Sequence, residues 1–129
     1  MKVCSKLVEV GTGPMKLHPI DELLGEAVEE SSVEEGVLWV SVKGAAPALV
    51  ILEEGPEERF VDTLRKLIPI TGWRRGNTYA HLTSTLLSAC LALPIAGKPL
   101  LDMPYRVYLL ETHPVHNHRR TIAITIYSE

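Results

Sequence analysis

The sequence predicts an α+β domain, a largely antiparallel two-sheet sandwich with about two main helices. Its patterns follow the order strand, strand, helix, strand, strand, helix, short helical segment and three strands, without the regular alternation of a doubly wound sheet. The 129 residues, of which 46% are hydrophobic, suffice for one core, so residues 1–129 are expected to form a single domain. In residues 121–127, isoleucines at every second position indicate a sheet that is covered on one side.

The first third of the chain carries a strand and a helix. Residues 6–10 predict a short strand, and residues 15–20 predict an extended segment that enters a helix at Asp21, a residue type that favours the N-cap. Apolar residues then recur at helical spacing, glutamates occupy the other face, and Gly36 marks the end of this helical segment. The acidic run is therefore interpreted mostly as a solvated helix surface.

The middle of the chain predicts two strands and a second helix. Residues 37–42 and 48–52 are short, continuous apolar runs, which favour well-buried strands, and we expect them to pair. Gly55 and Pro56 open a helix whose inward stripe is Phe60, Val61, Leu64 and Leu67.

The second helix is followed by a basic loop and further elements. The loop, residues 71–76, precedes Asn77, which can cap a short helix that extends to Leu87. Three strands complete the chain, at residues 90–95, 105–110 and 121–127.

The composition excludes several classes of function. A formal charge of −3 and an aromatic content of 5% argue against nucleic-acid binding. No apolar run reaches the ~20 residues that span a bilayer, and the first residues lack the apolar block of a signal peptide, so we expect no membrane contact and a soluble, cytoplasmic protein. Cys4 and Cys90 are interpreted as packing residues. The lack of glutamine and the two asparagines are typical of thermophile proteins.

Charge is divided unevenly along the chain. Residues 1–58 hold 12 acidic and 4 basic side chains, whereas residues 59–129 hold 4 acidic and 9 basic ones. This division suits charged surfaces that meet between subunits, a cationic groove for an anionic ligand, or simply solvated helix faces in the first half.

Several stretches together carry a family resemblance. They are GVLWVSV, ALVILEEGPEE, NTYAHLTSTLLSACLALPIAGKPLL and RRTIAITI, within about residues 20–126, and the most specific element is Asn77 four residues before His81. These stretches resemble the YjbQ-like family, often called secondary thiamine-phosphate synthases. The resemblance implies a fold of two packed sheets with helices, a homotrimer, and condensation of a pyrimidine diphosphate with a thiazole phosphate.

The chain departs from the family pattern at several positions. Family members usually carry His-Thr-Thr-Ala after the strand at 37–42, whereas residues 44–47 here are Gly-Ala-Ala-Pro. The family's Asn-Ala-His-Ala-His stretch has Tyr79 in place of its middle histidine, and Pro104 and Tyr105 replace a usual Trp-Gln pair. An active site of several histidines is therefore rebuilt or lost in this chain.

His81 is the strongest candidate for catalysis, because imidazole acts as acid, base or ligand near neutral pH. The resemblance adds Glu111 as a second catalytic candidate and Asn77 as a ligand-binding neighbour, and Ser84 could share the helical face of His81. The alternative is a locally bonded histidine with Ser84 as a small packing residue. Glu53 is a further candidate for a pocket carboxylate.

Two pairs of arginines suit an anionic ligand. Arg74 and Arg75 precede a helix start, where guanidinium groups and exposed N–H groups attract phosphate. Arg119 and Arg120 are adjacent in a strand, so they should point to opposite faces, and only one of them can easily serve a given pocket. A solvated turn is the alternative for the first pair.

The histidine-rich segment ETHPVHNHRR suggests a metal clip, a phosphate cradle or a polar turn. His116 and His118 are two residues apart and would project to the same side of a strand, whereas His113 could join them only through a turn. A closed zinc site needs three or four ligands and no cysteine is near, so an exposed loop between two strands competes with the metal hypothesis. The sequence identifies no cofactor, and a divalent metal is one option.

Two functions follow from these observations. One is a homotrimer that binds a small phosphorylated ligand in an inter-subunit cleft containing Asn77, His81, Glu111 and an arginine, with thiamine-phosphate synthase activity by resemblance. The other is a diverged, non-catalytic trimer with a binding or structural role. Nucleic-acid binding is not expected.

Overall fold

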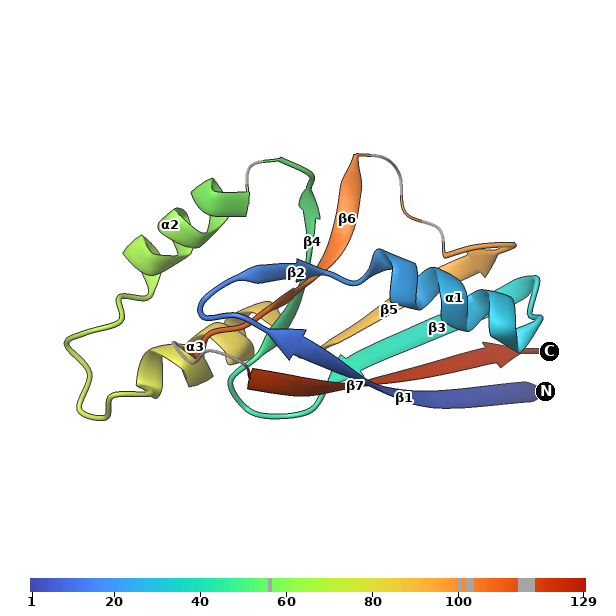
Figure 1. Cartoon of the computed structure of the whole chain (residues 1–129), viewed down its shortest axis with the longest axis horizontal. Helices are drawn as coiled ribbons and strands as arrows, with labels where there is room; N and C mark the ends of the chain where they lie inside the picture. The colour runs from blue at the N-terminus through green and yellow to red at the C-terminus, as the bar shows by residue number, and fades with distance from the viewer. Residues whose placement is uncertain (56, 100, 102–103, 114–117) are drawn as a thin grey trace.

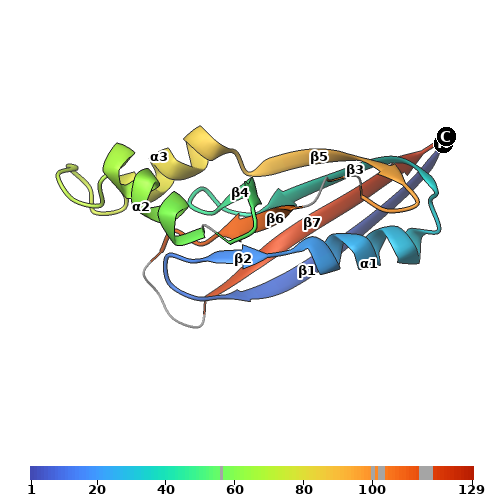
Figure 2. The ribbon, with the colours of Figure 1, turned by 90° about the horizontal axis from the view of Figure 1, so that it is seen from above.

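The structure is a computed structural model that describes residues 1–55, 57–99, 101, 104–113 and 118–129. The described residues form two antiparallel sheets and three helices, as the sequence predicts for an α+β sandwich (Figure 1). Helices α2 and α3 lie at one end of the long axis, and both chain termini lie at the other (Figures 1 and 2). No described helix is long and apolar enough to cross a membrane.

The larger sheet has four strands in the order β1-β7-β3-β5. These are β1 (Lys2–Thr12), β7 (His118–Ser128), β3 (Glu35–Val42) and β5 (Cys90–Ala96). Strand β1 is longer than the five residues expected at 6–10, because it pairs with β7 along its whole length, from Lys2 opposite Ser128 to Thr12 opposite His118. This register brings the end of β1 beside the start of β7.

The smaller sheet has three strands in the order β2-β6-β4. These are β2 (Leu17–Pro19), β6 (Tyr105–Leu110) and β4 (Ala48–Glu53). The expected pairing of residues 37–42 with 48–52 is wrong, because β3 lies between β7 and β5 while β4 pairs with β6. The connection between β3 and β4 therefore crosses from one sheet to the other.

Helix α1 (Asp21–Ser31) begins one residue earlier than a capping Asp21 would require, so the expected N-cap is wrong. Ile20 occupies the N-cap without a side-chain hydrogen bond to a described residue, and the carboxylate of Asp21 accepts bonds from Arg106 Nε and the backbone N–H of Val107. The expected end at Gly36 is also wrong, because Ser32 is the C-cap and Gly36 lies in β3, where a Cβ atom would collide with the carbonyl of Tyr127.

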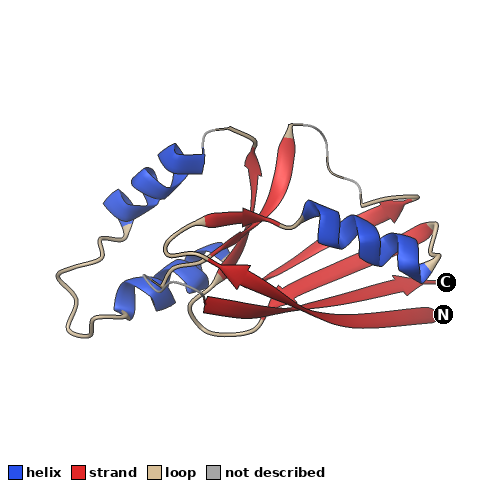
Figure 3. Ribbon diagram, viewed as in Figure 1, coloured by secondary structure: helices blue, strands red, loops and turns tan. Residues whose placement is uncertain are grey.

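Helices α2 (Glu57–Leu67) and α3 (Thr78–Leu87) pack on the smaller sheet (Figure 3). The inward stripe of α2 is confirmed at Leu64, and at Phe60 and Val61, which pack against the same core, but Leu67 is 71% exposed and Ile68 is buried in its place. Asn77 is the N-cap of α3, yet its side chain bonds to His81 and to no described backbone N–H of the helix. The short helical segment expected after residue 77 is thus a ten-residue helix.

The core has two parts, one on each face of the smaller sheet. The first part fills the space between the two sheets and α1, and it includes the isoleucines of β7 at positions 122, 124 and 126, whose burial confirms the predicted alternation. The second part packs α2 and α3 against the other face of β4 and β6. The smaller sheet is therefore the middle layer of the domain.

The outer face of the larger sheet is covered by no described residue and carries several apolar side chains. They are Val3 and Leu7 of β1, Val37 and Trp39 of β3, and Tyr127 of β7. Residues 37–42 were expected to be buried on both faces, but Trp39 is 46% exposed. Cys90 is also exposed, so its interpretation as a packing residue is wrong, whereas Cys4 packs against the core.

Candidate functional site

A buried ion pair between Glu111 and Arg120 forms the centre of the candidate site. Arg120 donates from Nε to Oε1 at 2.9 Å and from Nη2 to Oε2 at 2.8 Å, so the pair is bidentate. Glu111 follows β6 directly, and Arg120 is the third residue of β7. Two strands from different sheets thus meet at this pair.

Glu111 is fully buried and is held by more than Arg120. The Thr12 hydroxyl donates to Oε1 at 2.7 Å, and the backbone N–H of His113 donates to Oε2 at 3.2 Å. Burial alone would raise the pKa of Glu111, but the bonds from Arg120, Thr12 and His113 outweigh burial and lower this pKa to about 2. Glu111 is therefore a charged anchor for Arg120 at neutral pH.

The charges of this pair act on the nearby His113 ring. The rings of His113 and His118 lie 6.1 Å apart between centroids. Burial lowers the pKa of His113, and the charge of Arg120 lowers it further, against the opposing effect of Glu111; His118 and His81 add to the lowering. His113 is consequently neutral at pH 7, and His118 and His81 both lie within electrostatic range of His113.

The other candidates on α3 have different roles. His81 is exposed, and its Nε2 lies 3.3 Å from the amide nitrogen of Asn77. Ser84 is buried and donates to the carbonyl of Pro47 at 2.7 Å, which agrees with the packing alternative. Tyr79, which stands where the family usually has histidine, donates its hydroxyl to the carbonyl of Thr112. Of the candidates on and beside α3, Asn77 and His81 are thus the ones that remain exposed to a ligand.

The four candidate arginines are not gathered in one place. Arg119 is 72% exposed and pairs with Glu9 on the outer face, while Arg120 points inward, as adjacent strand positions require. Arg74 and Arg75 are exposed in the loop before α3, and no ion pair of either is found among the described residues. Glu53, at the end of β4, is exposed as well.

The metal hypothesis receives no support from the described residues. His116 lies outside them, and within them no group of three or more histidine, cysteine, aspartate or glutamate side chains could hold a metal ion. The role of His118 as a metal ligand stays a prediction. No chemical step is therefore assigned to a divalent metal.

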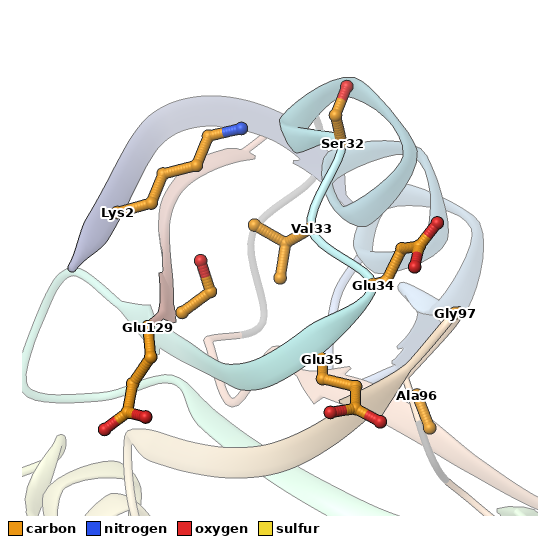
Figure 4. A pocket seen from close by; sticks show the side chains of 9 residues that line it. Lys2, Ser32, Val33, Glu34, Glu35, Ala96, Gly97 and Glu129 are labelled. Atoms are coloured by element: carbon orange, nitrogen blue, oxygen red, sulfur yellow. The ribbon is translucent and has the colours of Figure 1, made fainter.

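Two hollows in the surface lie away from this cluster. One, of about 670 Å³, lies beside both chain termini and is lined by Lys2 and by the carboxylates of Glu34, Glu35 and Glu129 (Figure 4). The other, of about 560 Å³, lies between β2 and α2 and is lined by Lys16, Arg106, Tyr108, Glu57 and other residues. Acidic side chains are prominent in both hollows, which disfavours a phosphorylated ligand there.

Sequence reasoning missed Thr12 and gave His113 only a minor role. No local signal marks Thr12, because it reaches Glu111 only through the pairing of β1 with β7. His113 is positioned by the hydrogen bonds of residues 15 and 16 to residues 113 and 111, which continue the smaller sheet beyond β6. These contacts depend on strand register and are invisible in residue spacing.

Comparison with known proteins gives a family and a fold. The family model described as UPF0047 protein YjbQ-like matches residues 6–129. No curated protein matches the chain. A YbjQ-like protein of unknown function from Sulfolobus solfataricus has a similar structure, with a TM-score of 0.90, 24% identity and 99% of each chain covered.

Other solved structures have the same fold. A hypothetical protein from Aeropyrum pernix has a TM-score of 0.87 at 22% identity over 100% of each chain. A conserved hypothetical protein from Thermus thermophilus has a TM-score of 0.83 at 22% identity, covering 95% of this chain and 99% of that chain. At these identities the likeness shows the architecture alone.

Proposed function

The chain belongs to the YjbQ-like (UPF0047) family, and from this premise we propose that it binds a small phosphorylated metabolite beside Arg120. The observation that carries the proposal is the state of the Arg120 guanidinium. Nε and Nη2 are bonded to the buried Glu111, whereas Nη1 lies beside Gly44, a residue that is itself exposed. A guanidinium fixed in this way presents its remaining edge to an oxyanion with little loss of conformational freedom on binding.

The surrounding imidazoles suit the same ligand. Neutral His113 can donate one hydrogen bond to a phosphate oxygen, and His118 and the exposed His81 lie within electrostatic range of it. Glu111 neutralises Arg120, so the attraction comes mostly from directed hydrogen bonds. We therefore expect a phosphate monoester to bind better than a simple monovalent anion.

The proposal includes a homotrimer whose ligand clefts lie between subunits. It is supported by the outer face of the larger sheet, where Val3, Tyr127 and Val37 stand in line across three strands and Trp39 lies in the next row. A contiguous apolar patch of this kind marks a protein–protein surface. Arg119 lies on the same face at the start of β7, so a subunit docked there would reach the rim of the site.

Analytical ultracentrifugation tests the assembly. The wild type should sediment at three times the chain mass of 14.3 kDa, and Trp39→Glu should sediment as a smaller species. A monomeric wild type would refute the trimer.

Two phosphate-binding measurements test the site. Arg120→Lys keeps the charge beside Glu111 but loses the bidentate geometry, so calorimetry should show at least tenfold weaker binding of inorganic phosphate. Arg59→Gln is the matched control, because Arg59 is exposed on α2, outside both the Glu111–Arg120 pair and the outer face of the larger sheet, and should leave the affinity unchanged. Equal affinities in wild type and Arg120→Lys would refute the proposed site.

The finer proposal, thiamine-phosphate synthase activity, rests on family resemblance. Its chemistry would displace diphosphate, and hydrogen bonds from Arg120 and His113 would stabilise the charge on the leaving group. Restored growth of a thiamine-requiring strain would support it. Failure to grow despite good expression would argue against it.

The second candidate is a non-catalytic binding protein of the same architecture. The observation that favours it is the loss of acid-base groups at two positions, because Gly44 has no side chain and the Tyr79 hydroxyl is committed to the carbonyl of Thr112. Phosphate binding without any condensation activity would select this candidate.

A further inference from the structure

The turn between β3 and β4, residues 43–47, passes the Arg120 guanidinium at close range. Gly44 has a φ of +119°, a conformation that favours glycine. A Cβ atom on Gly44 would lie 3.3 Å from Arg120 Nη1 and 3.2 Å from the Cδ of Pro47, tighter than ordinary contacts. The position thus needs glycine both for its backbone angle and for the approach of the arginine.

The turn is held at both ends by hydrogen bonds. The backbone N–H of Lys43 donates to the carbonyl of Thr121 at 2.9 Å. At the other end, the buried Thr112 hydroxyl donates to the carbonyl of Ala46 at 2.8 Å, and Ser84 donates to Pro47. The turn is therefore bonded through the N–H of Lys43 at one end and the carbonyls of Ala46 and Pro47 at the other, which fixes the backbone between them.

The backbone N–H groups in the middle of the turn have no such hydrogen-bond partners among the described residues. No described residue accepts a hydrogen bond from the backbone N–H of Gly44, Ala45 or Ala46. Gly44 and Ala45 are exposed, Ala46 is buried, and no side chain of the three is larger than a methyl group. Successive backbone N–H groups next to a residue of positive φ form the kind of concavity that binds anions.

From this convergence we infer that the Gly44–Ala46 turn supplies the backbone half of the anion site, opposite Nη1 of Arg120. The inference rests on the proposed function and names its ligand class as a phosphate monoester with a tetrahedral, dianionic head. In this arrangement the backbone N–H groups of the turn donate to some oxygens of the phosphate, and the Arg120 guanidinium donates to others. His113 completes the site. The small residues of this turn then have a binding role, although they lack the polar side chains usual in the family at these positions.

Amide chemical shifts of the isotope-labelled wild-type protein test this directly. On titration with inorganic phosphate, the amide signals of residues 44–46 should move, and they should saturate at the dissociation constant found by calorimetry. If phosphate binds and these signals stay still, the inference is wrong while the proposed function stands. If the wild type binds no phosphate by either method, the proposed function and the inference both fail.

Two matched glycine variants provide the second test. Gly44→Ala adds a methyl group where Arg120 Nη1 lies, whereas Gly55→Ala meets nothing within 4 Å at a nearly equal φ of +115°. Both variants place alanine at a similar positive φ, so only the first should weaken phosphate binding, by at least tenfold. Equal affinities of the two variants would overturn the inference. If Gly44→Ala does not fold, the wild-type titration decides.

Discussion

Arg106 lies on β6 and Arg120 on β7, the last two strands of the chain, which belong to different sheets. Both arginines pair with carboxylates, but their surroundings differ. Arg106 donates to Asp21 at 3.1 Å and to Glu54 at 3.3 Å, and its side chain is 29% exposed. Arg120 donates twice to the single, fully buried Glu111 and is itself 10% exposed. One arginine ties three chain segments together, and the other is held by one carboxylate with Nη1 beside a glycine turn.

The difference separates a structural ion pair from a candidate binding group. Arg106 links β6 to the start of α1 through Asp21 and to the residue after β4 through Glu54. It uses two nitrogens on two acids, so an added anion would have to compete with both of them. Arg120 uses two nitrogens on one acid and keeps a third directed at Gly44, so a ligand can add to the pair without breaking it.

Removal of the buried carboxylate charge should give the largest effect. Glu111→Gln leaves Arg120 charged and largely buried with a weaker partner, so we expect a loss of about 3 kcal/mol in the free energy of unfolding. Asp21→Asn is the matched control on the more exposed Arg106 pair and should cost less than about 1 kcal/mol. Urea unfolding at a fixed protein concentration measures both. Similar losses for the two variants would contradict the distinction between the pairs.

The fall of the unfolding free energy at acid pH should show the contribution of Glu111, with a magnitude similar to that of the Glu111→Gln substitution. Its pKa is about 2 in the folded protein, below an ordinary value of 4.5, so the stabilisation is fully present above pH 4.5 and is lost as the pH falls toward 2. A shift of this size corresponds to about 3 kcal/mol of linkage. Unfolding free energies between pH 5 and pH 2.5 should therefore fall more steeply for wild type than for Glu111→Gln. Parallel curves would show that Glu111 is not the group responsible.

The elements with strong local periodicity were predictable from the sequence. The alternation in residues 121–127 gave β7 and its buried face, and the helical spacing after residue 20 gave α1. Local patterns do not encode which strands pair, so the expected pairing of residues 37–42 with 48–52 was wrong. Asp21 was a plausible N-cap by residue type, but a tertiary bond to Arg106 took its carboxylate.

The candidate site was predictable only in part, for the same reason. Family motifs pointed to Glu111, Arg120 and His81, and strand alternation indicated that Arg119 and Arg120 face opposite ways. Thr12 lies 99 positions before Glu111 in the chain and meets it through strand register alone. Gly44 counted as a lost histidine in the sequence, and only coordinates show that its missing side chain admits the Arg120 guanidinium.

The pH dependence of anion binding should reveal whether His113 acts beside Arg120. Burial and Arg120 lower the pKa of His113 below 6.5, so His113 gains a positive charge only as the pH falls below that value. Sulfate keeps its charge over this range, and we expect its affinity to rise about fivefold as His113 protonates, since one added charge near the surface contributes about 1 kcal/mol. Four other charged or titratable groups also influence the pKa of His113: Arg120, Glu111, His118 and His81.

Calorimetry of sulfate binding between pH 7.5 and pH 5 provides this measurement. His113→Gln should reduce the rise in affinity at low pH, although any contribution from His118 and His81 would remain. His18→Gln is the control, because His18 accepts a bond from the backbone N–H of Gly13 on the β2 side of the sheet. An unchanged pH profile in His113→Gln would exclude His113 from the anion site.

The smallest effect on anion binding is expected at the Arg106 end, where Tyr108 donates its hydroxyl to Glu57 at 2.8 Å. Burial, followed by the bond to Glu57, raises the pKa of Tyr108 to about 12, so folded-state stability linked to this phenol falls as the pH rises from about 10 to 12. In a 295 nm titration, one of the four tyrosines should ionise last, and Tyr108→Phe should remove that component while phosphate binding stays unchanged. Weakened phosphate binding in Tyr108→Phe would mean that the two arginine networks are coupled, and the separation between a structural end and a binding end would have to be abandoned.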